Sequence, residues 1–98
     1  MNLLVEGFEW DPAHQPKGNI RHIANHNVFP DEAEEIFELP EEVLIRKTRQ
    51  GYRIAYGRSN AGRYLLVVFI IKPGNIIRVI TARDMNRRER RYYQLNIE

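Results

Sequence analysis

Two spacings of hydrophobic residues divide the chain into a helical first part and a second part made mostly of strands. In residues 17–26 the apolar side chains recur at helical intervals, which predicts a short helix, and Asn27 is suited to end it in a left-handed conformation. Pro30 is suited to the first turn of a second helix. The apolar stripe of that helix would consist of Ala33, Ile36 and Phe37.

An apolar arm or short strand is predicted before these helices. Residues 3–5 are apolar, and Phe8 and Trp10 continue the pattern up to Pro12, which restricts its predecessor to extended geometry.

Four strands are predicted in the second part, at residues 41–48, 52–58, 63–71 and 76–82, because turn-forming residues separate these apolar runs. Residues 63–71 are the most apolar stretch, so we expect them to form a central strand. Arg78 interrupts an otherwise apolar face of the last strand. The short connections favour an antiparallel meander.

A basic helix is predicted to follow the strands. Asn86 and Glu89 have the spacing of a capping box, and the cations of the helix that they open are Arg87, Arg88, Arg90 and Arg91. The order of elements predicts an α+β fold: an N-terminal arm or strand and two helices, an antiparallel four-stranded sheet and a C-terminal basic helix. Residues 1–98 are short enough to form one domain.

Composition excludes several classes of protein. The 98 residues contain no cysteine, which excludes a disulfide scaffold, a thiolate nucleophile and cysteine-ligated metal sites. No apolar run approaches the roughly 18 residues that span a bilayer, and the first residues do not resemble a secretion signal. We therefore expect a cytoplasmic protein without a membrane partner.

Charge is distributed unevenly along the chain. Residues 1–45 contain ten acidic and two basic residues, a net charge of −8, whereas residues 46–98 contain thirteen basic and three acidic ones, a net charge of +10. Twelve of the fifteen cations are arginine, whose planar fork binds phosphate with two hydrogen bonds. A basic face for nucleic acid is one interpretation, and mutual neutralisation of the two halves is the other.

The chain has three histidines, His14, His22 and His26, and the last two are candidates for proton transfer. The last two are four residues apart in the first predicted helix and could share one face. RNA can be cleaved without a metal when two such groups move protons and a cation stabilises the charge on phosphorus. A two-histidine metal site has the same spacing, but the other ligands of a metal-binding motif are missing. Structural imidazoles are the third interpretation.

Arginines within strands or at strand ends, such as Arg58, Arg78 and Arg83, are more informative than those on the final helix because a sheet holds its side chains more rigidly. Arg78 could instead pair with an acid of the second helix. The arginines of the final helix could form only a solvated face, and the tyrosines could belong to the core rather than stack on bases.

Four blocks of sequence, at residues 8–12, 22–37, 56–69 and 77–93, resemble the BrnT family of bacterial toxins in their order and spacing. The most specific parts are the FEWD start and the TAR and RRER segments near the end. The resemblance implies a RelE-like fold, metal-independent endoribonuclease activity without a cofactor, and neutralisation by a BrnA antitoxin with a ribbon-helix-helix domain. It also implies that operator DNA is bound only through the toxin–antitoxin complex.

The chain departs from the family pattern at several positions. Asn25 replaces a common lysine and Asp84 a common arginine, and Asp84 would repel RNA unless it pairs with Arg83 or with an arginine of the final helix. Phe29 replaces a capping serine or threonine, which would cost about 1 kcal/mol of helix stability unless its side chain packs elsewhere.

These observations favour a ribonuclease toxin in which Arg58 and Arg83 bind the phosphate and His26 or His22 moves protons. Glu9 is a candidate base or orienting group. The candidate RNA-binding residues are Arg78, Arg87, Arg88, Arg91 and Tyr92. A non-catalytic module that keeps the fold and binds an antitoxin-like protein or RNA is the main alternative. A direct DNA-binding regulator has only the basic helix in its favour.

Overall fold

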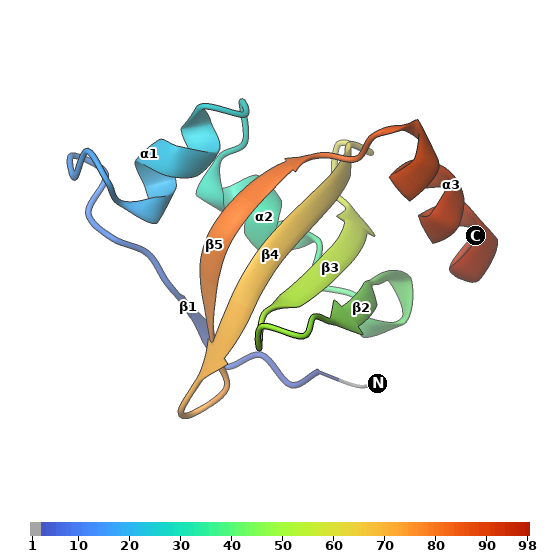
Figure 1. Ribbon diagram of the computed structural model, residues 1–98, viewed down its shortest axis with the longest axis horizontal. Coiled ribbons are helices and arrows are strands. Elements are labelled where there is room, and N and C mark those ends of the chain that lie inside the picture. Colours follow the sequence, from blue (N-terminus) through green and yellow to red (C-terminus); the bar gives the residue numbers. More distant parts are fainter. Residues whose placement is uncertain (1–2) are drawn as a thin grey trace.

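The computed structural model describes residues 3–98 and contains one five-stranded sheet (Figure 1). The strands are β1 (Gly7–Glu9), β2 (Leu44–Lys47), β3 (Arg53–Arg58), β4 (Tyr64–Lys72) and β5 (Ile76–Asp84). The helices are α1 (Asn19–Ala24), α2 (Pro30–Glu35), the 3₁₀ turn η1 (Pro40–Glu42) and α3 (Arg87–Asn96). The strand order β1-β5-β4-β3-β2 places β4 at the centre, as its apolar sequence predicted.

The α+β fold is confirmed, and a RelE-like arrangement fits it. Strands β2 to β5 form the predicted antiparallel meander. The N-terminal arm adds a fifth strand, β1, which pairs in parallel with the first residues of β5. Only three residues of the arm belong to this strand, so most of the opposite edge of β5 is left without a strand partner.

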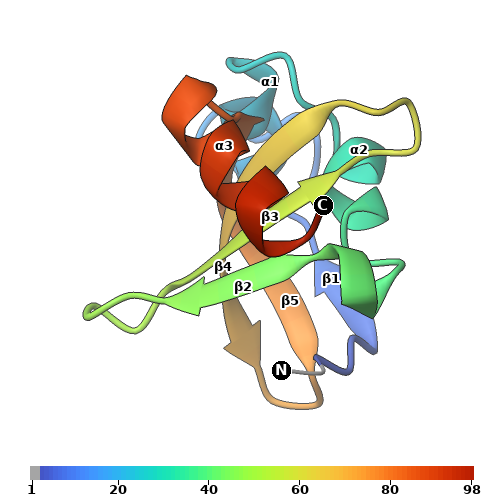
Figure 2. The same ribbon diagram turned by 90° about the vertical axis from the view of Figure 1, so that its right-hand side faces the viewer.

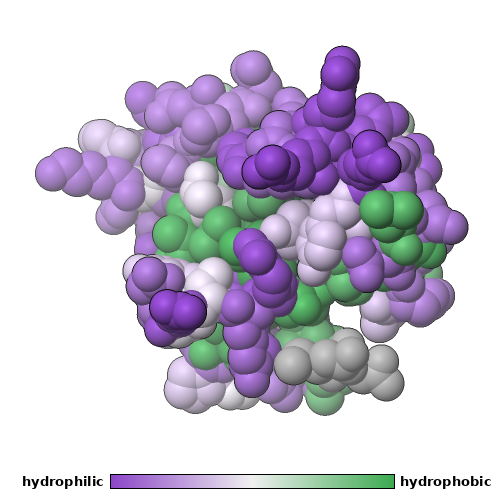
Figure 3. Space-filling view, turned by 45° about the vertical axis from the view of Figure 1, so that its right-hand side comes forward, coloured by the Kyte–Doolittle hydropathy of each residue, from purple (hydrophilic) through white to green (hydrophobic). Residues whose placement is uncertain are grey.

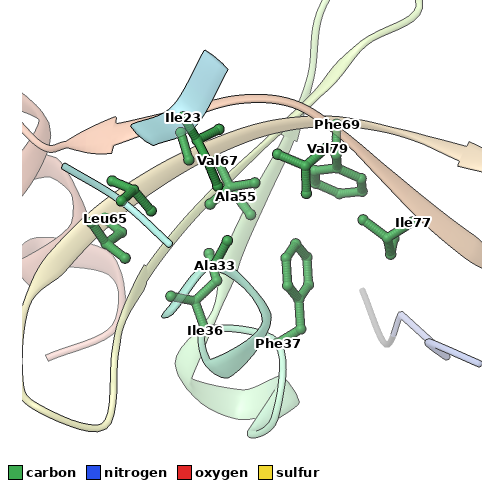
Figure 4. Packing of buried hydrophobic residues seen from close by; sticks show 12 residues of the cluster. Ile23, Ala33, Ile36, Phe37, Ala55, Leu65, Val67, Phe69, Ile77 and Val79 are labelled. Carbon is green, nitrogen blue, oxygen red and sulfur yellow. The ribbon is translucent and has the colours of Figure 1, made fainter. Parts of the chain in front are cut away.

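One face of the sheet packs against α1 and α2 and forms the main core (Figure 4). The buried residues shown there include Ile23 of α1, Ala33 of α2 and the central strand residues Val67 and Phe69. The segment after α2 approaches β3 so closely that a Cβ atom added to Gly57 would lie 2.9 Å from the Cβ atom of Ile36. Glycine at this position therefore allows the close packing of helix and sheet.

The other face, which we call the open face, is covered by α3 at one end only, so that α3 and α2 lie on opposite sides of the sheet (Figure 2). Tyr56, Leu66 and Tyr93 form a small second core under α3. Beyond it, Ile54, Val68 and other apolar residues of the open face are only half-buried. Figure 3 shows apolar surface between hydrophilic side chains on this side of the molecule.

Several boundaries differ from the sequence prediction. The helix predicted at residues 17–26 is α1, which spans only Asn19–Ala24 and so does not include His26. At its start, the side chains of Asn19 and Asp11 each accept a hydrogen bond from the other residue's backbone N–H group. Asn27 has a φ of 60°, the left-handed conformation that was predicted. The strand predicted at residues 41–48 begins only at Leu44, because Pro40 starts the turn η1.

The capping predictions are confirmed at both helices concerned. The Phe29 side chain provides no cap to α2 and is 58% exposed. The backbone N–H of Phe29 donates a hydrogen bond to the Glu32 carboxylate. In α3, Asn86 and Glu89 form the predicted capping box. Among residues 3–98, none of the helices has the length and apolar character needed to cross a membrane.

Candidate functional site

His22 lies beside the free edge of β5, where it contacts a strand residue. Its Nε2 atom is 3.1 Å from Oγ1 of Thr81. The helix that carries it is fixed there by Asn19, whose Nδ2 atom donates to the carbonyl oxygens of Glu9 and Val79. This placement is possible because β1 is short and leaves the later part of β5 accessible.

His26 lies after the end of α1 and faces His22, with the two ring centroids 5.8 Å apart and the rings nearly perpendicular. Both histidines are exposed. The sequence prediction that these two side chains come together is confirmed by this geometry. Two neighbouring imidazoles can serve as the acid and the base of a proton-transfer reaction.

Arg83 lies two residues after Thr81 on β5, so the two side chains share a face about 7 Å apart along the strand. Its Nη1 and Nη2 atoms donate to the Glu89 carboxylate over 2.7 and 2.8 Å. This pair holds the pKa of Glu89 below its ordinary value, chiefly through the hydrogen bonds from Arg83. The Arg83 side chain is positioned by Glu89 yet remains 40% exposed.

Arg63, which the sequence analysis did not single out, connects β4 to the loop that carries His26. Its guanidinium donates to the Asp84 and Glu32 carboxylates and to the carbonyl oxygens of His26 and Asn27. The hydrogen bonds from Arg63 lower the pKa of Asp84. Asp84 thus has a cationic partner, but this partner is Arg63, just before the neighbouring strand β4, and neither Arg83 nor an α3 arginine.

Arg58 lies apart from Arg83. Its Nη1 atom is 3.3 Å from the Glu98 carboxylate, just after α3, whereas Arg83 contacts Glu89 in the first turn of that helix. Because the ten residues of α3 span about 15 Å, the structure does not bring Arg58 and Arg83 onto a single phosphate.

Glu9 and Arg78 lie near the opposite end of β5. Arg78 pairs with Glu9 and Asp11 rather than with an acid of the second helix, so the predicted alternative partner of Arg78 is wrong. Hydrogen bonds from Lys72 and Arg78 lower the pKa of Glu9 from its ordinary value. A general base that works near neutral pH needs a raised carboxyl pKa, so this environment favours an ion-pair role for Glu9.

The outer side of α3 carries cations that no acid neutralises in the part of the chain that the structure describes. These exposed residues are Arg87, Arg88 and Arg91. Tyr92 is 39% exposed beside them, and its ring contacts that of Tyr56 edge-on, with 5.3 Å between the centroids. Burial raises the pKa of Tyr56.

No group of three or more His, Asp or Glu side chains suitable for a metal ion is found among residues 3–98. The two neighbouring histidines have no carboxylate beside them that would complete such a set there.

Comparison with known protein families finds one family that matches most of the chain. The family described as "Ribonuclease toxin, BrnT, of type II toxin-antitoxin system" matches residues 10–89. A search of curated proteins found no significant match. The matched residues begin with Trp10, directly after β1, and include His22, His26 and the first turn of α3. The chain therefore belongs to the BrnT family of ribonuclease toxins of type II toxin-antitoxin systems.

Proposed function

We propose that this chain is a metal-independent endoribonuclease whose reactive groups are the two histidines and Arg83 at the free edge of β5. Family membership implies an RNA substrate and an antitoxin partner. The observation that carries the proposal is the contact of His22 with Thr81, two residues before Arg83 on the same strand. It brings imidazole groups and a positioned guanidinium to one end of the sheet.

The proposed reaction needs no group beyond these side chains. One imidazole accepts the proton of the ribose 2′-hydroxyl as this oxygen forms a bond to phosphorus, and the other donates a proton to the 5′-oxygen as its bond to phosphorus breaks. Arg83 stabilises the negative charge that develops on the phosphoryl oxygens. The products are a 2′,3′-cyclic phosphate and a 5′-hydroxyl end.

The remaining candidate residues receive binding or structural roles. The α3 cations Arg87, Arg88 and Arg91 attract the RNA backbone, and the exposed ring of Tyr92 offers a stacking surface for a base. Arg78 and Glu9 neutralise each other, and their ion pair fixes β1 of the N-terminal arm to β5.

The proposed partner is a ribbon-helix-helix antitoxin of the BrnA type that covers part of the open face. As the family resemblance implies, operator DNA would be bound only by the toxin–antitoxin complex. Half-buried Ile54, Val68 and Ile70 on this face would pack against apolar residues of the antitoxin. Exposed Arg46 and partly exposed Arg83 beside them would pair with its acidic residues.

A non-catalytic module is the second candidate, and one observation favours it. Arg83 already forms a two-point ion pair with Glu89, and the adjacent residue Asp84 is acidic. RNA would have to share Arg83 with the Glu89 carboxylate, which weakens the contact of Arg83 with a phosphate.

Cleavage of labelled single-stranded RNA by the purified protein in EDTA tests the proposal. We expect His22→Ala and Arg83→Ala each to lower the rate by about 100-fold or more. His14→Ala and Arg49→Ala are matched controls, because these exposed residues lie outside the proposed centre and should leave the rate unchanged.

Two results would contradict the enzyme proposal. Cleavage at the wild-type rate by both variants would exclude the proposed centre. Wild-type protein that binds RNA but leaves it intact, with or without magnesium, would establish the non-catalytic module instead.

A further inference from the structure

A cationic pocket of about 380 Å³ lies at the end of the sheet where β3, β4 and β5 meet α3 near Arg90. Arg58, Arg63 and Arg90 line it, together with the Tyr64 ring and Asp84. Arg63 is fully engaged by Asp84 and Glu32, so it contributes little free charge. The two remaining arginines decide what the pocket can bind.

Arg58 and Arg90 both stack on Tyr64. The central guanidinium carbons lie 4.6 and 4.0 Å from the ring centroid, respectively. An aromatic face attracts guanidinium groups and thereby holds both cations at the same pocket. Both cations therefore line one pocket, and their combined positive charge favours the binding of an anion there.

Arg58 is further oriented by the loop between β3 and β4. Its Nε and Nη2 atoms donate to the carbonyl oxygen of Gly62, whose φ of +86° suits glycine. The ion pair with Glu98 is 3.3 Å long and involves side chains that are 44% and 35% exposed. An exposed pair of this kind is weak, so a phosphate can compete with Glu98 for Arg58.

The Arg90 side chain forms no hydrogen bond or ion pair with any residue in the described part of the chain, although its guanidinium is held on the Tyr64 ring. All of its N–H donors are therefore available to a ligand. A planar guanidinium with free donors matches the oxygens of a phosphate group.

We propose that Arg90 and Arg58, held on Tyr64, bind a phosphate of the RNA chain next to the one that is cleaved. This inference rests on the proposed ribonuclease function and deepens it by giving the substrate a second contact. Asp84 and Met85 of the pocket wall directly follow Arg83, so the pocket adjoins the proposed reactive edge. Arg90, Arg58 and Tyr64 are thus substrate-binding residues that do not touch the reacting atoms.

Binding of a 2′-O-methyl RNA oligonucleotide, which cannot undergo the reaction, tests this subsite by fluorescence anisotropy at several salt concentrations. We expect Arg90→Ala to weaken binding about tenfold and to reduce the slope of log K against log salt by about 0.7, the value for one lost contact to a single strand. Tyr64→Leu should weaken binding in the same direction, because it removes the support of both arginines.

Arg49→Ala is the matched control for the loss of one positive charge. Arg49 is exposed in the turn between β2 and β3, at the opposite end of β3 from Arg58 (Figure 2). The Arg49→Ala variant should bind the oligonucleotide with the affinity of the wild type. With cleavable RNA, Arg90→Ala should raise KM more than it lowers kcat, because the lost contact is to a phosphate that does not react.

The outcomes separate this subsite from the proposed function. Wild-type affinity and salt slope in both Arg90→Ala and Arg58→Ala would overturn the subsite, even if the wild type cleaves RNA. Weakened binding by these variants would support the subsite even if the wild type cleaves nothing, in which case only the catalytic proposal fails.

Discussion

At the scale of single residues, the arginines fall into two groups according to their partners. Arg63, Arg78 and Arg83 of the strands or strand ends are held by carboxylates over 3.1 Å or less. The arginines of α3 have no acidic partner among residues 3–98. Arg63, Arg78 and Arg83 therefore hold segments together, while the arginines of α3 remain available for a ligand.

Arg63→Met should destabilise the protein more than any other single arginine replacement. The variant removes donors from two carboxylates and two carbonyl oxygens, so these acceptors lose their partners. Breaking a buried charge pair costs several kcal/mol, and because Asp84 is 61% exposed we expect a smaller loss of about 2 kcal/mol. Urea denaturation measures it.

Arg49→Met provides the comparison for this stability measurement. Its exposed position in a turn predicts a change within about 0.5 kcal/mol. Equal urea midpoints for the two variants would show that the Arg63 contacts contribute nothing to stability.

At the scale of elements, α3 is attached to the sheet at both ends and in the middle. The Arg83–Glu89 pair holds its first turn, and the Tyr93 hydroxyl donates to the carbonyl oxygen of Glu42 over 2.6 Å. Arg58 and Glu98 connect the segment that follows the helix. The basic helix thereby keeps a fixed position beside the proposed reactive edge.

The capping box of α3 should make a measurable contribution of its own. The Asn86 side chain accepts a hydrogen bond from the backbone N–H of Glu89 over 2.8 Å. Asn86→Ala leaves this N–H without its partner and should lower the free energy of unfolding by about 1 kcal/mol. Asn86→Asp keeps an accepting side chain and should retain wild-type stability, and a urea midpoint for Asn86→Ala equal to that of Asn86→Asp would contradict the prediction.

Local signals in the sequence allowed the helices and strands to be predicted. Which strands and side chains contact each other could not be predicted from these signals. The Asn86–Glu89 spacing, the apolar run of β4 and the left-handed Asn27 are determined within a few residues, and the structure confirms them. The parallel pairing of β1 and the role of Arg63 depend on contacts between distant segments.

The same distinction holds for the candidate site. Helical spacing correctly brought His22 and His26 together. It could not show that Arg58 and Arg83 contact opposite ends of α3, because that separation follows from the packing of the helix on the sheet.

At the scale of the whole molecule, the acidic and basic halves of the chain partly neutralise each other. Four of the seven ion pairs found among residues 3–98 join the acidic first half to the basic second half: Arg63–Glu32, Lys72–Glu9, Arg78–Glu9 and Arg78–Asp11. The unpaired α3 arginines leave a local positive surface. Both interpretations of the charge pattern thus describe part of the molecule.

These ion pairs predict how stability depends on pH. Hydrogen bonds from Lys72, Arg78, Arg63 and Arg83 lower the pKa values of Glu9, Asp11, Asp84 and Glu89 from their ordinary values of 3.8 to 4.5. Below about pH 4.5 the unfolded chain therefore binds more protons than the folded protein. The stability from these pairs is complete above that pH and is lost as the pH falls through the lower, folded-state values.

Tyrosine should limit stability at the alkaline end, because burial raises the pKa values of Tyr56 and Tyr93 above the ordinary value of 10.0. Above pH 10 the unfolded chain loses these protons first, so stability falls as the pH rises further.

Melting temperatures measured from pH 3 to pH 11 should show a plateau that declines at both ends. Because the acidic decline comes from partly exposed ion pairs, 0.5 M NaCl should make it shallower, and a melting temperature that stays constant down to pH 3 would contradict the stabilising role of the pairs.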